Sequence, residues 1–122
     1  MKQLNQFSRA IVAILMILGV SLSTLAHDFS VGGIYYDILD ETAKTVEVTY
    51  RGSSSSAYSG EYTGDVAIPN SVTYGSTTYS VTSIGYSAFR DCTGLTSVTI
   101  PNSVTSIGSH VFYDCDGLTS VT

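Results

Sequence analysis

Basic residues are scarce in this sequence, which contains five lysine and arginine residues against ten acidic ones. Two of the five, Lys2 and Arg9, lie within the first 26 residues, so residues 27–122 carry a net charge of 3 − 10 = −7. The cations that remain there are Lys44, Arg51 and Arg90. Three cations cannot neutralise a run of phosphates. This shortage excludes nucleic acid and an anionic membrane surface as partners.

Histidine and cysteine are scarcer still, with two of each. A catalytic histidine needs a nucleophile and an orienting acid, and the spacing around His27 and His110 supplies neither. The two cysteines, Cys92 and Cys115, have no nearby histidine pattern and make a poor zinc site. We therefore expect no catalytic residues, no metal site and no cofactor.

Long hydrophobic runs are absent apart from AIVAILMILGV, the eleven residues at 10–20. As a helix, this run would span only about half of the roughly 30 Å hydrocarbon layer. It follows a basic start and precedes Thr24 and Ala26, which suit the −3 and −1 positions of a signal-peptidase site. This order is typical of a secretory signal peptide; a signal anchor that stays in the membrane is the alternative. We expect a mature chain that begins at His27, is secreted or held at the cell surface, and does not insert into a membrane.

Repetition dominates the rest of the sequence. VTSIGYSAFRDCTGLTSVT begins at Val81 and VTSIGSHVFYDCDGLTSVT begins at Val104, with 14 identical residues in 19. An imperfect copy lies upstream, because IPNSVT occurs at Ile68 and again at Ile100, with nine extra residues in the spacing. A fixed period of 23 residues lies in the range of leucine-rich repeats, where each unit forms one coil of a solenoid.

Each unit begins with the alternation of a short strand. Val98 and Ile100 point to one side of it, and Ser97 and Thr99 point to the other. Pro101 lacks a backbone N–H and ends the strand.

The second half of the unit is expected to turn back toward the core. Gly108 is predicted to adopt a backbone conformation closed to larger residues. SHVF predicts a short helical turn that points Val111 and Phe112 inward, and both Phe89 and Phe112 should be buried between neighbouring coils. One coil cannot bury its apolar side alone, but stacked coils can. The predicted fold is a mainly β leucine-rich-repeat solenoid with 23-residue repeats.

The stretch GLTSVTIPNSVTSIGSHVFYDCDGLTSVT resembles the BspA-like leucine-rich-repeat family of bacterial secreted and surface proteins. The resemblance is strong over residues 65–122 and weaker back to His27, where DFSVGGIYYDILDETAKTVEVTY is similar to the module that precedes such repeats. It implies a binding module for adhesion or protein–protein interaction, without catalysis, whose partner is an extracellular or host protein or a glycan. The alternative is a structural spacer or a glycan-binding repeat domain of a larger exported protein.

The region before the repeats predicts an N-terminal β-hairpin cap. Ile34, Tyr36 and Ile38 share one face of a strand, and Val46 and Val48 share a face of the next. Since the open end of a solenoid needs a cover, a hairpin here would serve as the cap.

A loop and a second hairpin follow the cap. RGSSSSAYSGEYTG is rich in glycine and serine, as loops are, and YGSTTY has turn chemistry between two strand-like arms. We thus divide the chain into a signal peptide at 1–26, a cap with its loop at 27–64, and repeats at 65–122.

Cys92 and Cys115 occupy equivalent positions in successive coils. Stacked strands lie about 4.8 Å apart, and parallel side chains keep their Cβ atoms near that spacing instead of the roughly 3.8 Å that a disulfide prefers. Two buried thiols are therefore favoured; a disulfide, common in exported proteins, is the alternative.

Six residues are candidates for a ligand-facing surface: Ser97, Thr99, Ser120, Thr122, Tyr74 and Tyr79. The four hydroxyl residues form a ladder on the strand face, the usual binding surface of repeat proteins, although such a ladder can serve solubility alone. The two tyrosines are among seven between positions 35 and 79. Their rings suit binding or, alternatively, cover the end of the core.

The last residue, Thr122, matches Thr99, where the earlier unit continues with Ile100 and Pro101. Stacked repeats generally need three or more units and capped ends. We therefore expect these residues to be the front of a longer protein that continues at the 23-residue period, which reading the coding DNA beyond Thr122 would check.

The signal-peptide assignment makes a direct prediction. Cleavage after Ala26 should leave His27 at the N-terminus of the exported protein, because small residues follow the apolar run at the expected distance. Mass spectrometry of the exported protein checks this, and an intact Met1 in the membrane fraction would contradict it.

Overall fold

The computed structural model describes residues 27–52 and 61–122, and the elements it contains there are all β-strands. The nine strands are β1 (Phe29–Val31), β2 (Ile34–Asp40), β3 (Thr45–Thr49), β4 (Gly64–Ala67), β5 (Ser71–Tyr74), β6 (Thr77–Ile84), β7 (Leu95–Thr99), β8 (Ser106–Ile107) and β9 (Ser120–Val121). The predicted signal peptide and most of the glycine- and serine-rich loop lie outside the described residues. Within those two ranges, no helix has the length and apolar character to cross a membrane.

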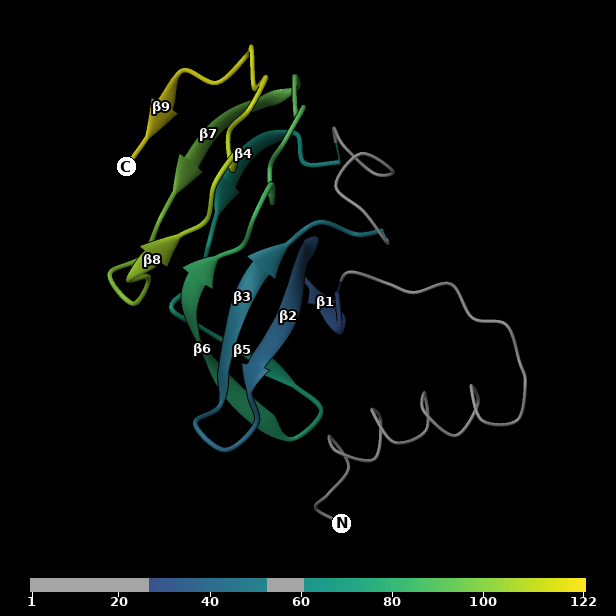
Figure 1. Ribbon diagram of the computed structural model, residues 1–122, viewed down its shortest axis with the longest axis vertical. Coiled ribbons are helices and arrows are strands. Elements are labelled where there is room, and N and C mark those ends of the chain that lie inside the picture. Colours follow the sequence, from purple (N-terminus) through teal and green to yellow (C-terminus); the bar gives the residue numbers. More distant parts are fainter. Residues whose placement is uncertain (1–26, 53–60) are drawn as a thin grey trace, which may run out of the picture.

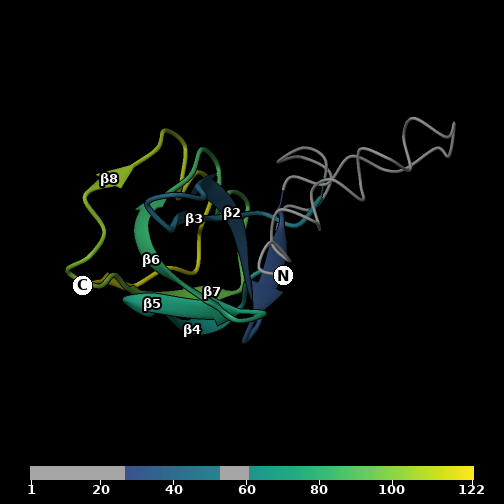
Figure 2. The same cartoon turned by 90° about the horizontal axis from the view of Figure 1, so that it is seen from below.

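The repeats form a solenoid with two parallel strand stacks. One stack is a three-stranded sheet in the order β4-β7-β9, and the other pairs β6 with β8 in parallel. Ser97 lies opposite Ser120 and Ser83 opposite Ser106, so each pairing joins residues one repeat apart. In Figure 2, β2 and β3 lie on one side of the molecule and β4 and β7 lie on the other, and β6 curves between them. The mainly β solenoid predicted from the period is confirmed.

The N-terminal hairpin is present and is hydrogen-bonded to the solenoid. β2 and β3 are antiparallel, and their turn is held by Asp40, whose Oδ1 accepts hydrogen bonds from the backbone N–H groups of Thr42 and Ala43. β3 then runs parallel to β6, with Val46 opposite Val81. The cap therefore adds the β2–β3 hairpin, with β1 at its edge, to the sheet that contains β6 and β8 (Figure 1).

The second predicted hairpin is formed by β5 and β6, with Thr73 opposite Thr78. Gly75 in its turn has φ +65°, a conformation that favours glycine. β6 is long enough to pair with β5 through its first half and with β3 and β8 through its second. The insertion in the first coil is thus an extension of one solenoid strand.

The division into a cap with its loop at 27–64 and repeats at 65–122 stays a prediction.

The core lies between the two stacks and is continuous from the cap into the repeats. Its fully buried side chains, each less than 2% exposed, are Tyr36, Tyr79, Phe89, Ile84, Leu95, Val46, Val48, Val81, Val98, Cys92 and Ser87. Phe89 is 0% exposed, as predicted, but Phe112 is only partly buried. The two rings stack with centroids 5.7 Å apart.

The loops that join the stacks are series of tight turns, and the helical turn expected at SHVF is not formed. Ser87, Asp91, His110 and Asp114 have φ between 56° and 60°, and these left-handed residues interrupt any helix. They occupy two repeat positions, each used twice, so the same backbone path recurs in both coils. Aspartate is one of the residues that tolerate this conformation.

Gly108 is needed for a different reason from the one predicted. It is not among the described residues with positive φ. Instead, a Cβ atom there would lie 2.7 Å from the backbone nitrogen of Tyr86, and Gly108 donates its N–H to the carbonyl of Ile84 at 2.8 Å. The coils approach so closely here that any side chain would force them apart.

The cysteines are not bridged to each other. Cys92 is buried, while Cys115 is partly exposed and its Sγ donates a hydrogen bond to the Phe89 carbonyl at 2.9 Å. Burial and, to a smaller extent, the charges of nearby aspartates raise the pKa of the Cys115 thiol. The thiols favoured by the spacing argument are therefore found, although only Cys92 is fully buried.

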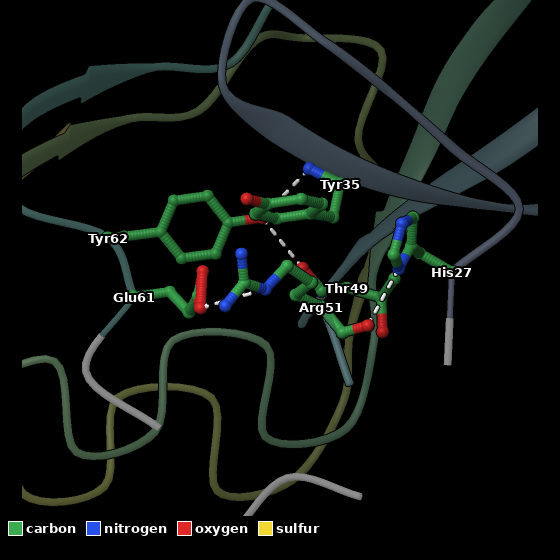
Figure 3. Close-up of polar contacts among 6 residues, drawn as sticks. All are labelled: His27, Tyr35, Thr49, Arg51, Glu61 and Tyr62. Atoms are coloured by element: carbon green, nitrogen blue, oxygen red, sulfur yellow. Dashed lines mark hydrogen bonds and ion pairs between the residues drawn. The ribbon is translucent and has the colours of Figure 1, made fainter. Parts of the chain in front are cut away.

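Tyr62 joins the cap to the first coil (Figure 3). Its hydroxyl donates to the Thr49 carbonyl at 2.7 Å and accepts from the Tyr35 N–H at 3.0 Å. Its ring packs against that of Phe89, with ring centroids 4.7 Å apart. Burial raises the pKa of the Tyr62 phenol far above its usual value, so the hydroxyl stays protonated and keeps donating to Thr49.

A nearby ion pair and a histidine contact border this junction. Arg51 Nε lies 3.2 Å from Glu61 Oε2, and the Arg51 carbonyl lies 2.7 Å from Nδ1 of His27 (Figure 3). These contacts bring the start of the described chain, the end of the cap and the start of the first coil together.

Replacing Tyr62 by phenylalanine should lower the free energy of unfolding by about 1–3 kcal/mol, because Thr49 and Tyr35 would each lose a hydrogen-bond partner in a buried site. Urea unfolding of the full chain measures this. Tyr86→Phe is the control, since that ring is 53% exposed and the change should be within about 0.5 kcal/mol. Equal midpoints for the two variants would contradict the role of the Tyr62 hydroxyl.

The unequal burial of the stacked phenylalanines gives a second stability prediction. Phe89→Ala should cost about 3–5 kcal/mol, and Phe112→Ala should cost less than half as much because its ring is partly exposed. The same denaturation experiment compares them. Similar losses for both would show that the coil at residues 104–122 is as tightly packed as the one before it.

Candidate functional site

The outward surface of the β4-β7-β9 sheet is the candidate site, and we call it the strand face. Strand pairing places Asp65, Ser97 and Ser120 in one row across the sheet. A second row contains Ala67 and Thr99, and Thr122 follows β9 at its edge. The hydroxyl ladder expected from the sequence is therefore formed, and it is joined by one carboxylate.

Asp65 organises the first row through two hydrogen bonds. Its Oδ1 accepts from Ser97 Oγ at 2.8 Å and from Thr96 Oγ1 at 2.8 Å. Both neighbours reach it because the pairing of β4 with β7 shifts register between Gly64 and Asp65. These hydrogen bonds, first from Thr96 and then from Ser97, hold the pKa of Asp65 below its usual value. The strand face thus carries a fixed negative charge at its first strand.

The backbone beneath the strand face is held by the coil-to-coil ladder. Thr122 donates its N–H to the Val98 carbonyl at 3.0 Å, and Ile100 donates to the Thr122 carbonyl at 2.8 Å. Val98 itself is 0% exposed and anchors the centre of the sheet in the core. The outward hydroxyls therefore project from a fixed support.

A groove of about 300 Å³ borders the strand face at β4. Its walls come from the turn at Gly32 and Gly33, from Glu61 and Tyr62, and from β4 itself. The groove is thus formed between the cap and the first coil, and Asp65 belongs both to it and to the strand face.

Chemically, this surface offers hydroxyl donors and acceptors around one ionised carboxylate. Such groups can hydrogen-bond a ligand and fix its orientation. In residues 27–52 and 61–122, no group of three or more histidine, cysteine, aspartate or glutamate side chains is placed to hold a metal ion.

The two candidate tyrosines do not lie on the strand face, and the prediction for Tyr79 is wrong. Its ring is 0% exposed in the core, and its hydroxyl lies 3.4 Å from Glu41 Oε1. Tyr74 is partly buried because it stacks on Phe29, with centroids 4.3 Å apart and an interplanar angle of 6°. Covering the core, the alternative considered for these rings, explains both.

Sequence reasoning missed Asp65, although the signal was present. Aligning the two IPNSVT segments places Asp65 opposite Ser97, which is also their pairing in the sheet. The inserted hairpin hid this match, because it removed the first coil from the 23-residue period.

Comparison with known proteins identifies the repeats. A family model described as a BspA type leucine-rich repeat region matches residues 54–122. A search among functionally curated proteins finds no significant match to the chain.

Solved structures give the same result. A leucine-rich repeat protein from Bacteroides ovatus is 34% identical with a TM-score of 0.66, over 79% of this chain and 23% of that one. A leucine rich cell surface protein from Faecalibacterium prausnitzii is 32% identical with a TM-score of 0.59, over 84% and 24%. A leucine-rich repeat protein from Bacteroides capillosus is 31% identical with a TM-score of 0.60, over 77% and 63%. This chain therefore spans less than a quarter of the length of the first two structures.

Proposed function

The chain belongs to the BspA-type leucine-rich repeat family, and on that basis we propose that it is a non-catalytic binding module displayed at the outer surface of a bacterial cell. Its ligand is an extracellular or host protein, and the strand face is the surface that contacts it.

The row formed by Asp65, Ser97 and Ser120 is the observation that carries this proposal. Repeat proteins use the extended surfaces of their stacked strands for binding. Here that surface is polar, supported by the hydrogen-bonded ladder between coils, and provided with an ionised Asp65 whose oxygen is already oriented by two hydroxyls. A surface that is fixed before binding loses little conformational entropy when a ligand arrives.

The surface location rests on the relatives. The protein from Faecalibacterium prausnitzii, which matches 84% of this chain, is described as a cell surface protein. A location outside the cytoplasm also agrees with the signal peptide expected at residues 1–26.

The test compares wild-type protein with a variant whose strand face is blocked. Thr99→Tyr combined with Ser120→Tyr places two bulky side chains on exposed strand positions while keeping residues that strands favour. Arrays of secreted proteins, cell-surface proteins and glycans should show protein ligands that bind the wild type and bind the variant at least about tenfold more weakly, which corresponds to roughly 1.4 kcal/mol.

A matched control places the same substitutions on another sheet. Thr78→Tyr combined with Ser80→Tyr changes exposed residues of β6 and should leave binding unchanged. Wild-type protein that binds nothing on any array would favour a structural spacer. Binding to glycans alone would favour a glycan-binding repeat domain, and equal loss in both variants would remove the strand face as the site.

A further inference from the structure

The two repeats differ at five of their 19 aligned positions. The identical positions are those that the coil needs, such as Phe89 with Phe112 in the core and Gly85 with Gly108 at the close approach. The differing pairs are Tyr86 and Ser109, Ser87 and His110, Ala88 and Val111, Arg90 and Tyr113, and Thr93 and Asp116. Ser87, Ala88 and Val111 are buried, so the core constrains them, whereas Tyr86, His110 and Tyr113 are exposed and are open to other uses.

Four of these residues meet on the surface, and we call them the aromatic cluster: Tyr86, Arg90, His110 and Tyr113. The rings of Tyr86 and His110 lie 5.7 Å apart at 63°, and those of His110 and Tyr113 lie 5.6 Å apart at 57°. Arg90 Cζ lies 5.1 Å from the centre of the Tyr113 ring. The side chains come from two loops, 85–94 and 108–119, that rise beside each other toward β7 and β9 in Figure 1.

The aromatic cluster is open to solvent although its members touch each other. Tyr86 is 53% exposed and Tyr113 is 48% exposed, which places both among the exposed large apolar residues of the described chain. Tyrosine and arginine are the residue types most enriched where proteins bind one another. An exposed group of this composition is a typical interaction surface.

The backbone under the aromatic cluster is fixed before any ligand arrives. The two loops are joined by hydrogen bonds from Ser87 N–H to the Ser109 carbonyl at 3.0 Å, and from Asp91 N–H to the Tyr113 carbonyl at 2.7 Å. Below them Phe89 stacks on Phe112 at an angle of 9°. A loop backbone held in this way loses little conformational entropy when a ligand binds.

The net charge of the two loops favours a positively charged ligand. They contain three aspartates, at positions 91, 114 and 116, and one arginine, so their balance is 1 − 3 = −2. Arg90 is already engaged, because its Nε lies 3.7 Å from Asp91 Oδ2 and its guanidinium covers Tyr113. The same sign extends over residues 27–122, whose net charge is −7. A cationic ligand is attracted to this surface at long range and an anionic one is repelled.

We propose that the aromatic cluster binds a basic segment of a partner protein, with an arginine or lysine side chain of that segment packed on the exposed tyrosine rings. Aromatic faces attract cations, and Arg90 over Tyr113 already shows this contact within the chain. The aspartates of the same loops supply the opposite charge. This site lies on the loops and is distinct from the strand face.

The test is an NMR titration of the isotope-labelled protein with three probes: a short glycine–serine peptide with two arginines, its glutamate counterpart, and a neutral trisaccharide of glucose. The arginine peptide should shift the backbone amide signals of residues 86–91 and 109–114, and the effect should weaken as salt is raised. The glutamate peptide and the trisaccharide should leave these signals in place.

The repeat itself supplies variants that the fold accepts. Tyr86→Ser combined with Tyr113→Arg installs at each position the residue that the other coil carries there, and it should weaken binding of the arginine peptide about tenfold. Arg90→Ala removes the competing guanidinium from Tyr113 and should tighten binding. Leu39→Ala, at another exposed apolar residue, is the control and should change nothing.

Several results would overturn the proposal. These are no shift at the aromatic cluster with the arginine peptide, unchanged affinity in the Tyr86→Ser and Tyr113→Arg variant, or a shift caused by the trisaccharide instead. Weaker binding of the arginine peptide by Arg90→Ala would also contradict it, because removal of the competing guanidinium should free the Tyr113 ring for the peptide. The Thr99→Tyr and Ser120→Tyr variant should bind the peptide as wild type does, so failure of this site and failure of the strand face can be told apart.

Discussion

The parallel pairing of β3 with β6 is the contact on which the rest of the structure depends. A solenoid coil has unpaired backbone groups and apolar side chains at its open end, and both need a partner. β3 meets both needs at once: it provides hydrogen bonds along β6, and it places Val46 and Val48, each 0% exposed, over the first coil. Tyr62 also links the first coil to the cap, because its hydroxyl is hydrogen-bonded to the backbone of both Thr49 and Tyr35. The later strands β8 and β9 then pair in parallel with β6 and β7 of the coil before them.

The repeated features of the fold were predictable from the sequence because they obey a period. Strand positions, the inward direction of Val98 and the two hairpins follow from alternation and turn chemistry, and the structure confirms them. Features that depend on contacts between coils were not predictable in this way. The backbone of the SHVF turn is set by the left-handed residues His110 and Asp114, and the need for Gly108 comes from the nearby backbone of Tyr86. Neither can be deduced from the residues of one coil alone.

The candidate site shows the same division. Ser97 and Ser120 were found because they repeat, and the structure places them side by side. Asp65 was missed because the β5–β6 hairpin displaces it from the 23-residue period. Tyr79 was placed on the surface wrongly, because a tyrosine in a strand whose neighbouring strands are unknown can point to the core or to solvent. Its 0% exposure follows from the fold of β6 against β3 and β5, which no single-strand pattern contains. In this protein, then, the identical residues describe the scaffold. Some exceptions to the repeat, such as Ala88 and Val111, lie in the core, and the exposed ones, such as Tyr86 and Tyr113, mark where one coil differs from the next in what it presents to solvent.

The match between the cap and the coils has an evolutionary consequence. Val46 pairs with Val81 in the same parallel manner in which Ile84 pairs with Ile107, so the cap occupies the place that a preceding coil would occupy. Because the cap pairs with the first coil as one coil pairs with the next, the number of coils that follow does not affect this contact. An in-frame duplication or loss of one repeat, of the kind that unequal recombination produces between near-identical DNA segments, would change the length of the stack by about 4.8 Å and leave every existing junction intact. Selection can therefore adjust the reach and the surface of such a protein by copying whole units, and diversify them afterwards at the few positions that the stack does not constrain.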